Sequence, residues 1–305
     1  MSLRKRLARG DHMIWLTGSA LGICLLMIFG LLAIILVNGL GIFWPRGIEQ
    51  VTTGDGSVLA GELAQRQAIP NPGHADHLLN HRIQLRTGNR DLYGVDFTWV
   101  DEDDIVKRDR PEGIFFVERS EYGPLIGTPV RIVDGEREIA FDPDAVRETL
   151  IGLVTQAARD REAIEGIEKD ELGQVNYEME RLRLEARRLD FQKDREPELD
   201  LSSERAEIRR LEEGAHARYV ELEAKLGLLL ESAAGTRVTF ETVDGREQDL
   251  ASLDIYRAYP ANELSAVERA GTYASRLWSF LTDEPREANT EGGIWPAIFG
   301  TVMMV

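Results

Sequence analysis

Cysteine and basic residues are both scarce in this sequence of 305 residues. The single cysteine, Cys24, excludes a disulfide framework within the chain and a zinc site built from several cysteines. The 36 lysines and arginines stand against 53 aspartates and glutamates, which leaves a net charge of −17. Because this charge would repel a polyanion, we expect no nucleic-acid partner.

Motifs of common enzymes and ATPases are also missing. The sequence has no G-x4-G-K-[ST] phosphate-binding loop, so it cannot drive transport with ATP by itself. It has no G-x-S-x-G motif and no pairing of a cysteine nucleophile with a histidine base. Among its many carboxylates, no pair stands out as an acid and a base. We therefore expect a protein that is not an enzyme and uses no cofactor.

Charged residues are absent from Met13 to Pro45, a run of 33 residues. A helix crosses about 30 Å of hydrocarbon with about 20 apolar residues, so this run predicts a transmembrane helix over residues 13–44. A cleaved signal peptide is the alternative interpretation. Its apolar region is only about 7–15 residues long and ends at a cleavage site of small residues. The run in this sequence is longer, and no A-x-A pattern follows it directly.

The residues on either side of this run predict its orientation. Residues 1–46 contain five basic residues and one acidic residue, so residues 47–305 carry a net charge of −21. Basic residues before a span mark the cytoplasmic side of the membrane. We therefore expect residues 1–12 to be a basic cytoplasmic N-terminus. The chain beyond the span should lie outside the bacterial inner membrane, in the periplasm.

Gly18 and Gly22 form a small-xxx-small pattern within the predicted span. Such a pattern lets a partner helix pack closely in the lipid bilayer, although glycine is also common in membrane helices without this role. Both interpretations stay open from the sequence.

Residues 46–141 read as short strands separated by turn signals. A pattern of strand, polar turn, strand and short apolar-acidic tail begins at Arg82 and recurs at Arg237. This weak repeat predicts that residues 46–141 and a returning β segment, 236–262, belong to one sheet-containing module.

Residues 142–235 predict a long antiparallel helical hairpin inserted into this module. Asp142 is a suitable N-cap before Pro143, and Pro197 ends the first arm before Ser202 or Ser203 caps the second. Each arm has a heptad seam of apolar or small residues. The first seam is Leu172, Val175, Met179, Leu182, Ala186 and Leu189. The second is Ile208, Leu211, Ala215, Leu222, Leu226 and Leu229, with a polar gap at Arg218.

Two glycines, Gly166 and Gly173, are candidate breaks in the first arm. At about 1.5 Å per residue, the longer arm would reach several tens of ångströms. We expect it to be a spacer or a docking surface.

The C-terminal region is first amphipathic and then apolar. Residues 263–291 predict an amphipathic periplasmic helix followed by a polar linker. Residues 292–305 contain no charge and predict the start of a second transmembrane helix. Because an apolar helix begins here, we expect the natural chain to continue past residue 305. The predicted fold class is therefore an α+β membrane protein.

Three histidines form an H-x-D-H-x3-H pattern, namely His74, His77 and His81. On a helix this spacing could hold a divalent metal ion. Pro70, Pro72 and Gly73 come directly before it and favour a solvated loop instead. We therefore expect no metal site, with these three residues as weak candidates.

The tail of the sequence resembles a known family. Residues 283–301 read DEPREANTEGGIWPAIFGT and resemble the start of the permease core of ABC importers. More narrowly, they resemble the long form of the phosphate permease subunits called PstA. In that family G-G-I/V-x-P-A-I-x-G-T opens the second membrane helix from the periplasmic side. The matching residues are Gly292, Gly293, Ile294, Pro296, Ala297, Ile298, Gly300 and Thr301.

A second segment, Asp254 to Asn262, resembles the stretch that follows the large periplasmic insertion of that family. The resemblance implies an inner-membrane subunit of an ATP-driven phosphate importer. Its partners would be a second permease subunit, cytoplasmic ATPase subunits and a periplasmic phosphate-binding protein. The E-A-A-x3-G coupling loop of such permeases is absent from these 305 residues, and no residue can be assigned to phosphate contact.

Two other classes of protein share parts of this organisation. A single-span periplasmic adaptor or scaffold also combines β structure with an inserted helical hairpin, but it should finish in soluble β structure and not in an apolar run such as 292–305. A single-span sensor would need a cytoplasmic output domain, which residues 1–12 are too short to form.

Overall fold

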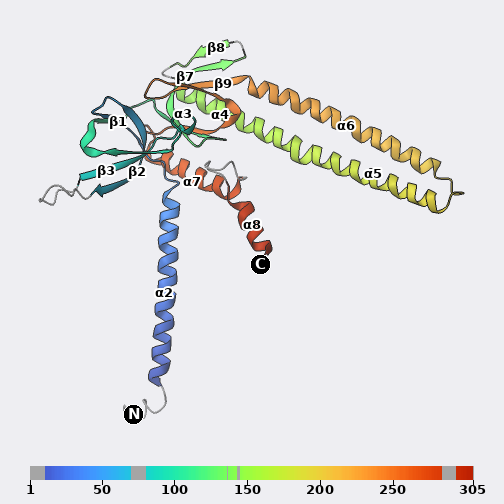
Figure 1. Cartoon of the computed structure of the whole chain (residues 1–305), viewed down its shortest axis with the longest axis horizontal. Helices are drawn as coiled ribbons and strands as arrows, with labels where there is room; N and C mark the ends of the chain where they lie inside the picture. The colour runs from blue at the N-terminus through green and yellow to red at the C-terminus, as the bar shows by residue number, and fades with distance from the viewer. Residues whose placement is uncertain (1–10, 70–79, 136, 143–144, 284–292, 305) are drawn as a thin grey trace. The chain divides into compact units, whose positions relative to one another are not determined.

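The computed structural model describes residues 11–69, 80–135, 137–142, 145–283 and 293–304 (Figure 1). These residues form two compact units. The first unit contains the chain up to Pro45 and, from Leu264 onward, the described part of the C-terminal region. The second runs from Arg46 to Glu263. The chain is α+β with antiparallel sheets and an apolar N-terminal helix, as the sequence predicts.

The first unit consists of helices. Helix α2, Asp11–Gly41, contains the one described segment, Trp15–Gly41, that is long and apolar enough to cross a bilayer, a property that signal sequences share. Helix α7, Ala266–Thr282, begins with a capping box between Ser265 and Glu268, and helix α8 is Trp295–Met304. Both helices agree with the predicted helical character of residues 263–304.

Helix α7 packs against the residues that follow α2. The rings of Phe43 and Phe280 lie 5.0 Å apart, and those of Trp44 and Tyr273 lie 5.8 Å apart. The Arg269 guanidinium donates to the carbonyl of Pro45 at 2.9 Å. Within this unit, the residues after the first helix are therefore tied to α7.

The strands of the second unit form two sheets. The first has the order β4-β3-β2-β1-β5. Its strands are β1 Ile48–Thr53, β2 Val58–Ile69, β3 Asn80–Arg86, β4 Phe97–Asp101 and β5 Ile105–Asp109. The second has the order β10-β9-β7-β6-β11, and β8 pairs with β7 outside this path. Its strands are β6 Phe115–Arg119, β7 Leu125–Asp134, β8 Arg137–Ala140, β9 Thr236–Glu241, β10 Glu247–Ala251 and β11 Ile255–Pro260.

These two sheets are copies of one topology. If β8 is left out and the five strands of each sheet are numbered in chain order, both sheets have the spatial order fourth, third, second, first, fifth. A 3-10 turn precedes the fifth strand in each sheet, Glu102–Asp104 in the first and Ser252–Asp254 in the second. The strand registers match as well. Val51 lies opposite Leu59 and Arg108 in the first copy. Val117 lies opposite Leu125 and Ala258 at the same places in the second. The second unit is therefore a structural repeat.

The predicted sheet-containing module thus holds two sheets. The segments beginning at Arg82 and Arg237 form the third strands, β3 and β9, of different sheets. The first segment does not continue as a two-strand hairpin, because Gly88 and Asn89 take positive φ angles of 59° and 50° and the chain forms the short helix α3, Arg90–Tyr93. The partner strand, β4, begins only at Phe97.

Each sheet has its own buried core. In the first it consists of Val51, Ile83, Leu85 and Val100. In the second it consists of Phe115, Val117, Leu125, Leu150, Val238, Phe240, Leu250, Ile255 and Ala258. Leu150 comes from the helical hairpin, so the base of the hairpin is part of the second core.

Two equivalent glycines mark close backbone approaches. A Cβ atom on Gly61 would lie 2.6 Å from the carbonyl oxygen of Arg86, and one on Gly127 would lie 2.9 Å from that of Glu241.

We expect Gly127→Ala to lower the free energy of unfolding by about 1–3 kcal/mol, because the strands must move apart. Urea unfolding followed by circular dichroism would measure this. Gly173→Ala, on an open helix surface, should instead raise stability by about 1 kcal/mol. Equal effects of the two changes would contradict the expected close approach.

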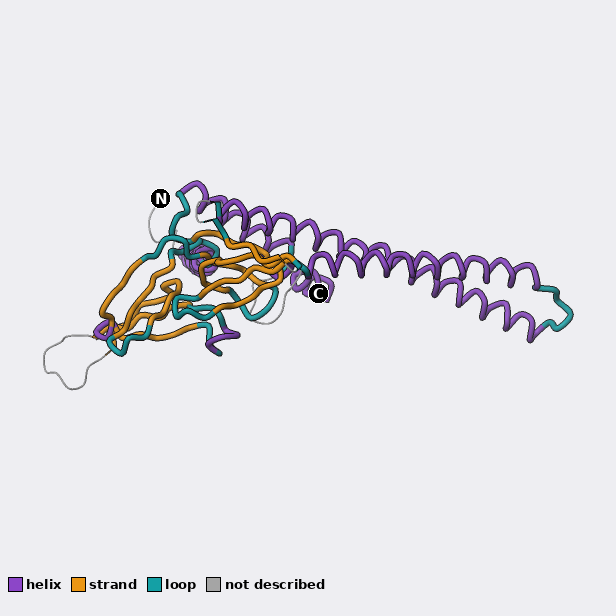
Figure 2. Tube along the Cα trace, turned by 90° about the horizontal axis from the view of Figure 1, so that it is seen from above, coloured by secondary structure: helices purple, strands orange, loops and turns teal. Residues whose placement is uncertain are grey.

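The hairpin lies between β8 and β9. Its first arm is α4 Val146–Glu165, a π-helical turn Gly166–Glu171 and α5 Leu172–Arg195, and its second arm is α6 Ser202–Ala234. Arg218 pairs with Glu178 at 2.6 Å and Arg205 pairs with Asp190 at 2.7 Å, so the arms are antiparallel. Figure 2 shows both arms extending side by side away from the strands.

Two local predictions for the first arm need correction. The helix begins at Val146 and not after Asp142, whose carbonyl accepts a turn hydrogen bond from the Ala145 amide; Pro143 lies outside the described residues. Gly166 and Gly173 do not break the arm, because the π-helical turn joins α4 to α5 without interruption.

The second seam is also shifted from its prediction. All six residues of the first seam are buried or half-buried, as predicted. In α6, however, Leu211 is 45% exposed, and Glu212 and Tyr219 take places in the seam. From Ile208 the seam continues in steps of four, three and four residues to Glu212, Ala215 and Tyr219. Arg218 then lies beside the seam, where it pairs with Glu178.

Candidate functional site

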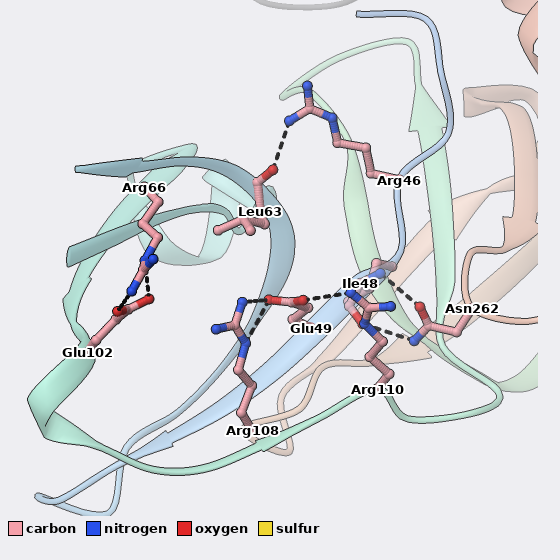
Figure 3. A network of polar contacts seen from close by, with 9 residues as sticks. All are labelled: Arg46, Ile48, Glu49, Leu63, Arg66, Glu102, Arg108, Arg110 and Asn262. Carbon is pink, nitrogen blue, oxygen red and sulfur yellow. Dashed lines mark hydrogen bonds and ion pairs between the residues drawn. The ribbon is translucent and has the colours of Figure 1, made fainter. Parts of the chain in front are cut away.

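The first and last strands of the second unit are joined by a hydrogen-bonded closure between Ile48 and Asn262. The side-chain oxygen of Asn262 accepts from the Ile48 amide at 2.9 Å, and its nitrogen donates to the Ile48 carbonyl at 2.9 Å (Figure 3). The same nitrogen also donates to the carbonyl of Pro111 at 2.8 Å. Ile48 is the first residue of β1, and Asn262 follows β11. One side chain thus joins positions that are 214 residues apart in the sequence.

Next to this closure lies a buried carboxylate. Glu49 has 7% of its side chain exposed and accepts hydrogen bonds from Arg108 and, at 2.9 Å, from Arg110 (Figure 3). Its equivalent in the second copy is Phe115, because Glu49 lies opposite Gly61 as Phe115 lies opposite Gly127. An ion cluster therefore stands in the first sheet where an aromatic core residue stands in the second.

The charge of Glu49 makes stability depend on pH. Burial acts to raise the pKa of this carboxyl, but the hydrogen bonds from Arg110 and Arg108 outweigh burial and lower the pKa below 4.5. Asp91 behaves in the same way: its burial acts to raise the pKa, and Arg119 lowers it below 3.8. Because both folded-state pKa values are depressed, the stabilisation is present above the unfolded-state pKa and disappears as the pH falls through the folded-state value.

We therefore expect the urea midpoint to fall on acidification below about pH 4.5, and Glu49→Gln to weaken this dependence while lowering stability at pH 7. Urea titrations between pH 3 and 7 would measure both effects. The exposed Asp103, changed to Asn, is the control. A midpoint that falls equally steeply in Glu49→Gln and in the unaltered chain would contradict the role of Glu49.

Helix α3 joins the two copies at a second place. Asn89 accepts from the Ile126 amide at 2.8 Å and donates to the Ile126 carbonyl at 2.9 Å, so its side chain binds β7 much as Asn262 binds β1. Asp91 forms a two-point pair with Arg119, both distances being 2.9 Å. Both residues lie in the segment that connects β3 to β4 of the first sheet. Their contacts join this segment to strands β7 and β6 of the second sheet.

A third set of contacts involves the turn between β9 and β10. The Tyr93 hydroxyl donates to Asp244 at 3.0 Å, and Arg246 donates to the carbonyl of Leu92 at 3.2 Å. The guanidinium of Arg246 also lies 5.3 Å from the centre of the Tyr93 ring. Together with the asparagine contacts, these bonds make the two copies one body.

The residues singled out from the sequence are not gathered at this site. His81 lies on β3, and His74, His77 and Gly292 lie outside the described residues. In the part of the chain that the structure describes, no group of three or more histidine, cysteine, aspartate or glutamate residues could hold a metal ion.

The predicted membrane motifs lie in the first unit. Gly18 and Gly22 lie on α2 with open space at their Cα atoms. Gly293 and Ile294 precede α8, which contains Pro296, Ala297, Ile298, Gly300 and Thr301. Neither helix packing by the two glycines nor a role in a permease core is tested by these positions, so both stay predictions.

Sequence reasoning missed the residues that hold the junction. Asn89 is part of a turn signal, Thr87-Gly-Asn89, that does not reveal its distant partner, and Asp91 and Arg119 carry no local signal. Glu49 and Val51 are two residues apart, so they lie on the same face of β1. An apolar residue is usual at the position of Glu49, and this departure from the pattern could be seen in the sequence. Asn262 ends the segment that resembles the permease family, but its bonding partners lie far away in the sequence.

The hydrogen bonds and ion pairs at this site join segments of the second unit to one another, so their role is to hold the fold together. Comparison with protein-family models, curated proteins and solved structures finds no match to this chain.

Proposed function

We propose that this chain is part of an inner-membrane permease subunit of an ATP-driven phosphate importer. Residues 1–12 lie in the cytoplasm, residues 13–44 cross the membrane, and the second unit lies in the periplasm. A second span begins in residues 292–305. The subunit works with a second permease subunit, cytoplasmic ATPase subunits and a periplasmic phosphate-binding protein.

The observation that carries this proposal is the closure by Asn262. A domain inserted between two neighbouring membrane helices must return the chain to the place where it left. Ile48 and Asn262 meet that requirement, because they are hydrogen-bonded to each other. Apolar helices occur on both sides of this domain in the sequence, α2 before it and α8 after it. The resemblance of residues 283–301 indicates the importer superfamily, and the choice of phosphate as substrate rests mainly on the extra domain that precedes them.

The hairpin favours one rival, a periplasmic adaptor or scaffold, because a protruding antiparallel arm is a bridging element. An adaptor has no need to return to the membrane, so the closure supports the permease over the adaptor. Under either function the hairpin lies in the periplasm.

The first test is topology. Cys24 is replaced by serine, and single cysteines are placed at Ser2 and at the exposed Tyr177. In intact spheroplasts a membrane-impermeant maleimide should label Tyr177→Cys and leave Ser2→Cys unlabelled until the cells are opened. The opposite pattern would contradict the proposed orientation.

The second test is transport. The complete reading frame, expressed with its partner subunits in cells that lack their own phosphate permease, should support uptake of radioactive phosphate. A shortened hairpin that joins Glu171 to Lys225 by a short glycine–serine turn should insert normally but lose most uptake, because it lacks the docking arm. This junction is chosen because the two residues pair at 4.0 Å and because Leu150 stays in the core. Membrane insertion without any uptake by the full-length protein would favour the adaptor.

A further inference from the structure

Helix α5 has two apolar faces, and α6 covers only one of them. The inner face is the seam that contains Val175 and Leu182, both buried. On the outer face stand Tyr177, Leu184 and Phe191, with 75%, 55% and 70% of their surface exposed. These three residues are seven positions apart, so they form a straight stripe along the helix.

Four arginines flank this stripe: Arg181, Arg187, Arg188 and Arg195. All four are exposed, and within the described residues none of them has an ion-pair partner on this chain. Arginines elsewhere on the hairpin do have partners, for example Arg183 with Glu180 and Arg218 with Glu178. Glu180 and Asp194 lie on the same flank as Arg187, three residues after Tyr177 and Phe191, and Glu180 pairs with Arg183. The outer face of α5 therefore carries an excess of unpaired arginines in a region of the chain, residues 47–305, that has a net charge of −21.

We propose that this face, defined by Leu184, Phe191 and the four arginines, binds an acidic amphipathic helix of a partner protein. The stripe offers one apolar side chain per heptad, half the density of a two-position coiled-coil seam, so the flanking charges would supply much of the specificity. Arginine and aromatic residues are the types enriched where protein interfaces bury most energy. The flanking arginines would meet glutamates or aspartates beside the partner's apolar stripe. This inference rests on the proposed function in one respect, namely that the hairpin is a docking arm.

Two other occupants fit less well. A second copy of α5 packed in parallel and in register would bring arginines against arginines, which costs affinity. A membrane surface binds helices that have a broad apolar face. Here the large apolar side chains form a single line about 10 Å apart, at 1.5 Å per residue.

The test uses a synthetic helical peptide with leucine once per heptad and glutamates beside it. The peptide is fluorescently labelled and titrated into the purified full chain in detergent. We expect saturable binding, weakening by at least about tenfold in Arg187→Glu/Arg188→Glu. The matched control is Arg209→Glu/Arg210→Glu on α6, which has the same charge change and should bind as the unaltered chain does. A peptide with lysines in place of glutamates should recover binding to the first variant only.

Three outcomes would overturn the inference. Equal affinity of the two double variants would show that general charge is responsible. Absence of recovery by the lysine peptide would remove the direct charge pairing. Binding of the chain to phosphatidylglycerol vesicles that depends on Arg187 and Arg188, without binding of the peptide, would assign this face to lipid. Because this assay measures no uptake, its failure is separate from failure of the transport test.

Discussion

Arg119→Ala is expected to lower the free energy of unfolding by about 3–5 kcal/mol, the largest effect of any single change considered for this protein. The Arg119 side chain has only 2% of its surface exposed, and the side chain of its partner Asp91 has 15%. It also donates to the carbonyl of Gly123 at 2.9 Å. Removing it leaves the partly covered Asp91 carboxylate and the buried Gly123 carbonyl without their donor, and the ion pair that joins α3 to β6 is lost.

The control for this change is Arg131→Ala. Arg131 also binds two carboxylates, those of Glu138 and Glu247, but its partners are 65% and 49% exposed. Because exposed pairs contribute about 0–1 kcal/mol, this change should have little effect. Urea unfolding of both variants at pH 7 would compare them. The double variant Asp91→Asn/Arg119→Met should recover part of the loss, because it leaves no unpaired charge. Equal losses for the two arginines would refute the importance of this buried pair.

Asn262→Ala is expected to cost about 3 kcal/mol, because it leaves the Ile48 amide and the carbonyls of Ile48 and Pro111 without this partner. The loss should be local as well as global, since it opens the second unit where the chain enters and leaves. Hydrogen exchange read by mass spectrometry should therefore accelerate at residues 48–50 in the variant.

Asn176→Ala is the matched control, because Asn176 lies exposed on the hairpin and its loss should change stability by less than about 0.5 kcal/mol. Under the proposed function, Asn262→Ala should also reduce phosphate uptake in the complete permease. Unchanged exchange at residues 48–50 would mean that the closure does not depend on Asn262.

Much of the local structure could be predicted from the sequence because its causes are local. Most of the charge-free run from Met13 to Pro45 lies in α2, which ends at Gly41. The seam through Val175 and Leu182 is buried as its spacing predicts, since residues three and four apart share a helix face. Ser265 and Glu268 form the capping box of α7, whose amphipathic pattern was visible in the sequence.

The second seam marks the limit of that reasoning. From Ile208, a step to Leu211 and a step to Glu212 are both compatible with a helix, and hydrophobicity favours leucine. The partner helix decides in favour of Glu212, because the first arm sets which face of α6 is covered. Periodicity within one helix carries no information about that choice.

By itself the sequence determined the helices, most of the strands and the alternation of buried and exposed faces, because each depends on residues a few positions apart. The tertiary structure alone decided that the strands divide into two sheets of one topology, that Gly61 and Gly127 are equivalent, and that Asn262 closes onto Ile48. These features depend on pairings between distant segments, and the closure joins residues 214 positions apart. Such pairings are selected by the packing of the whole unit, and no short stretch of sequence encodes them.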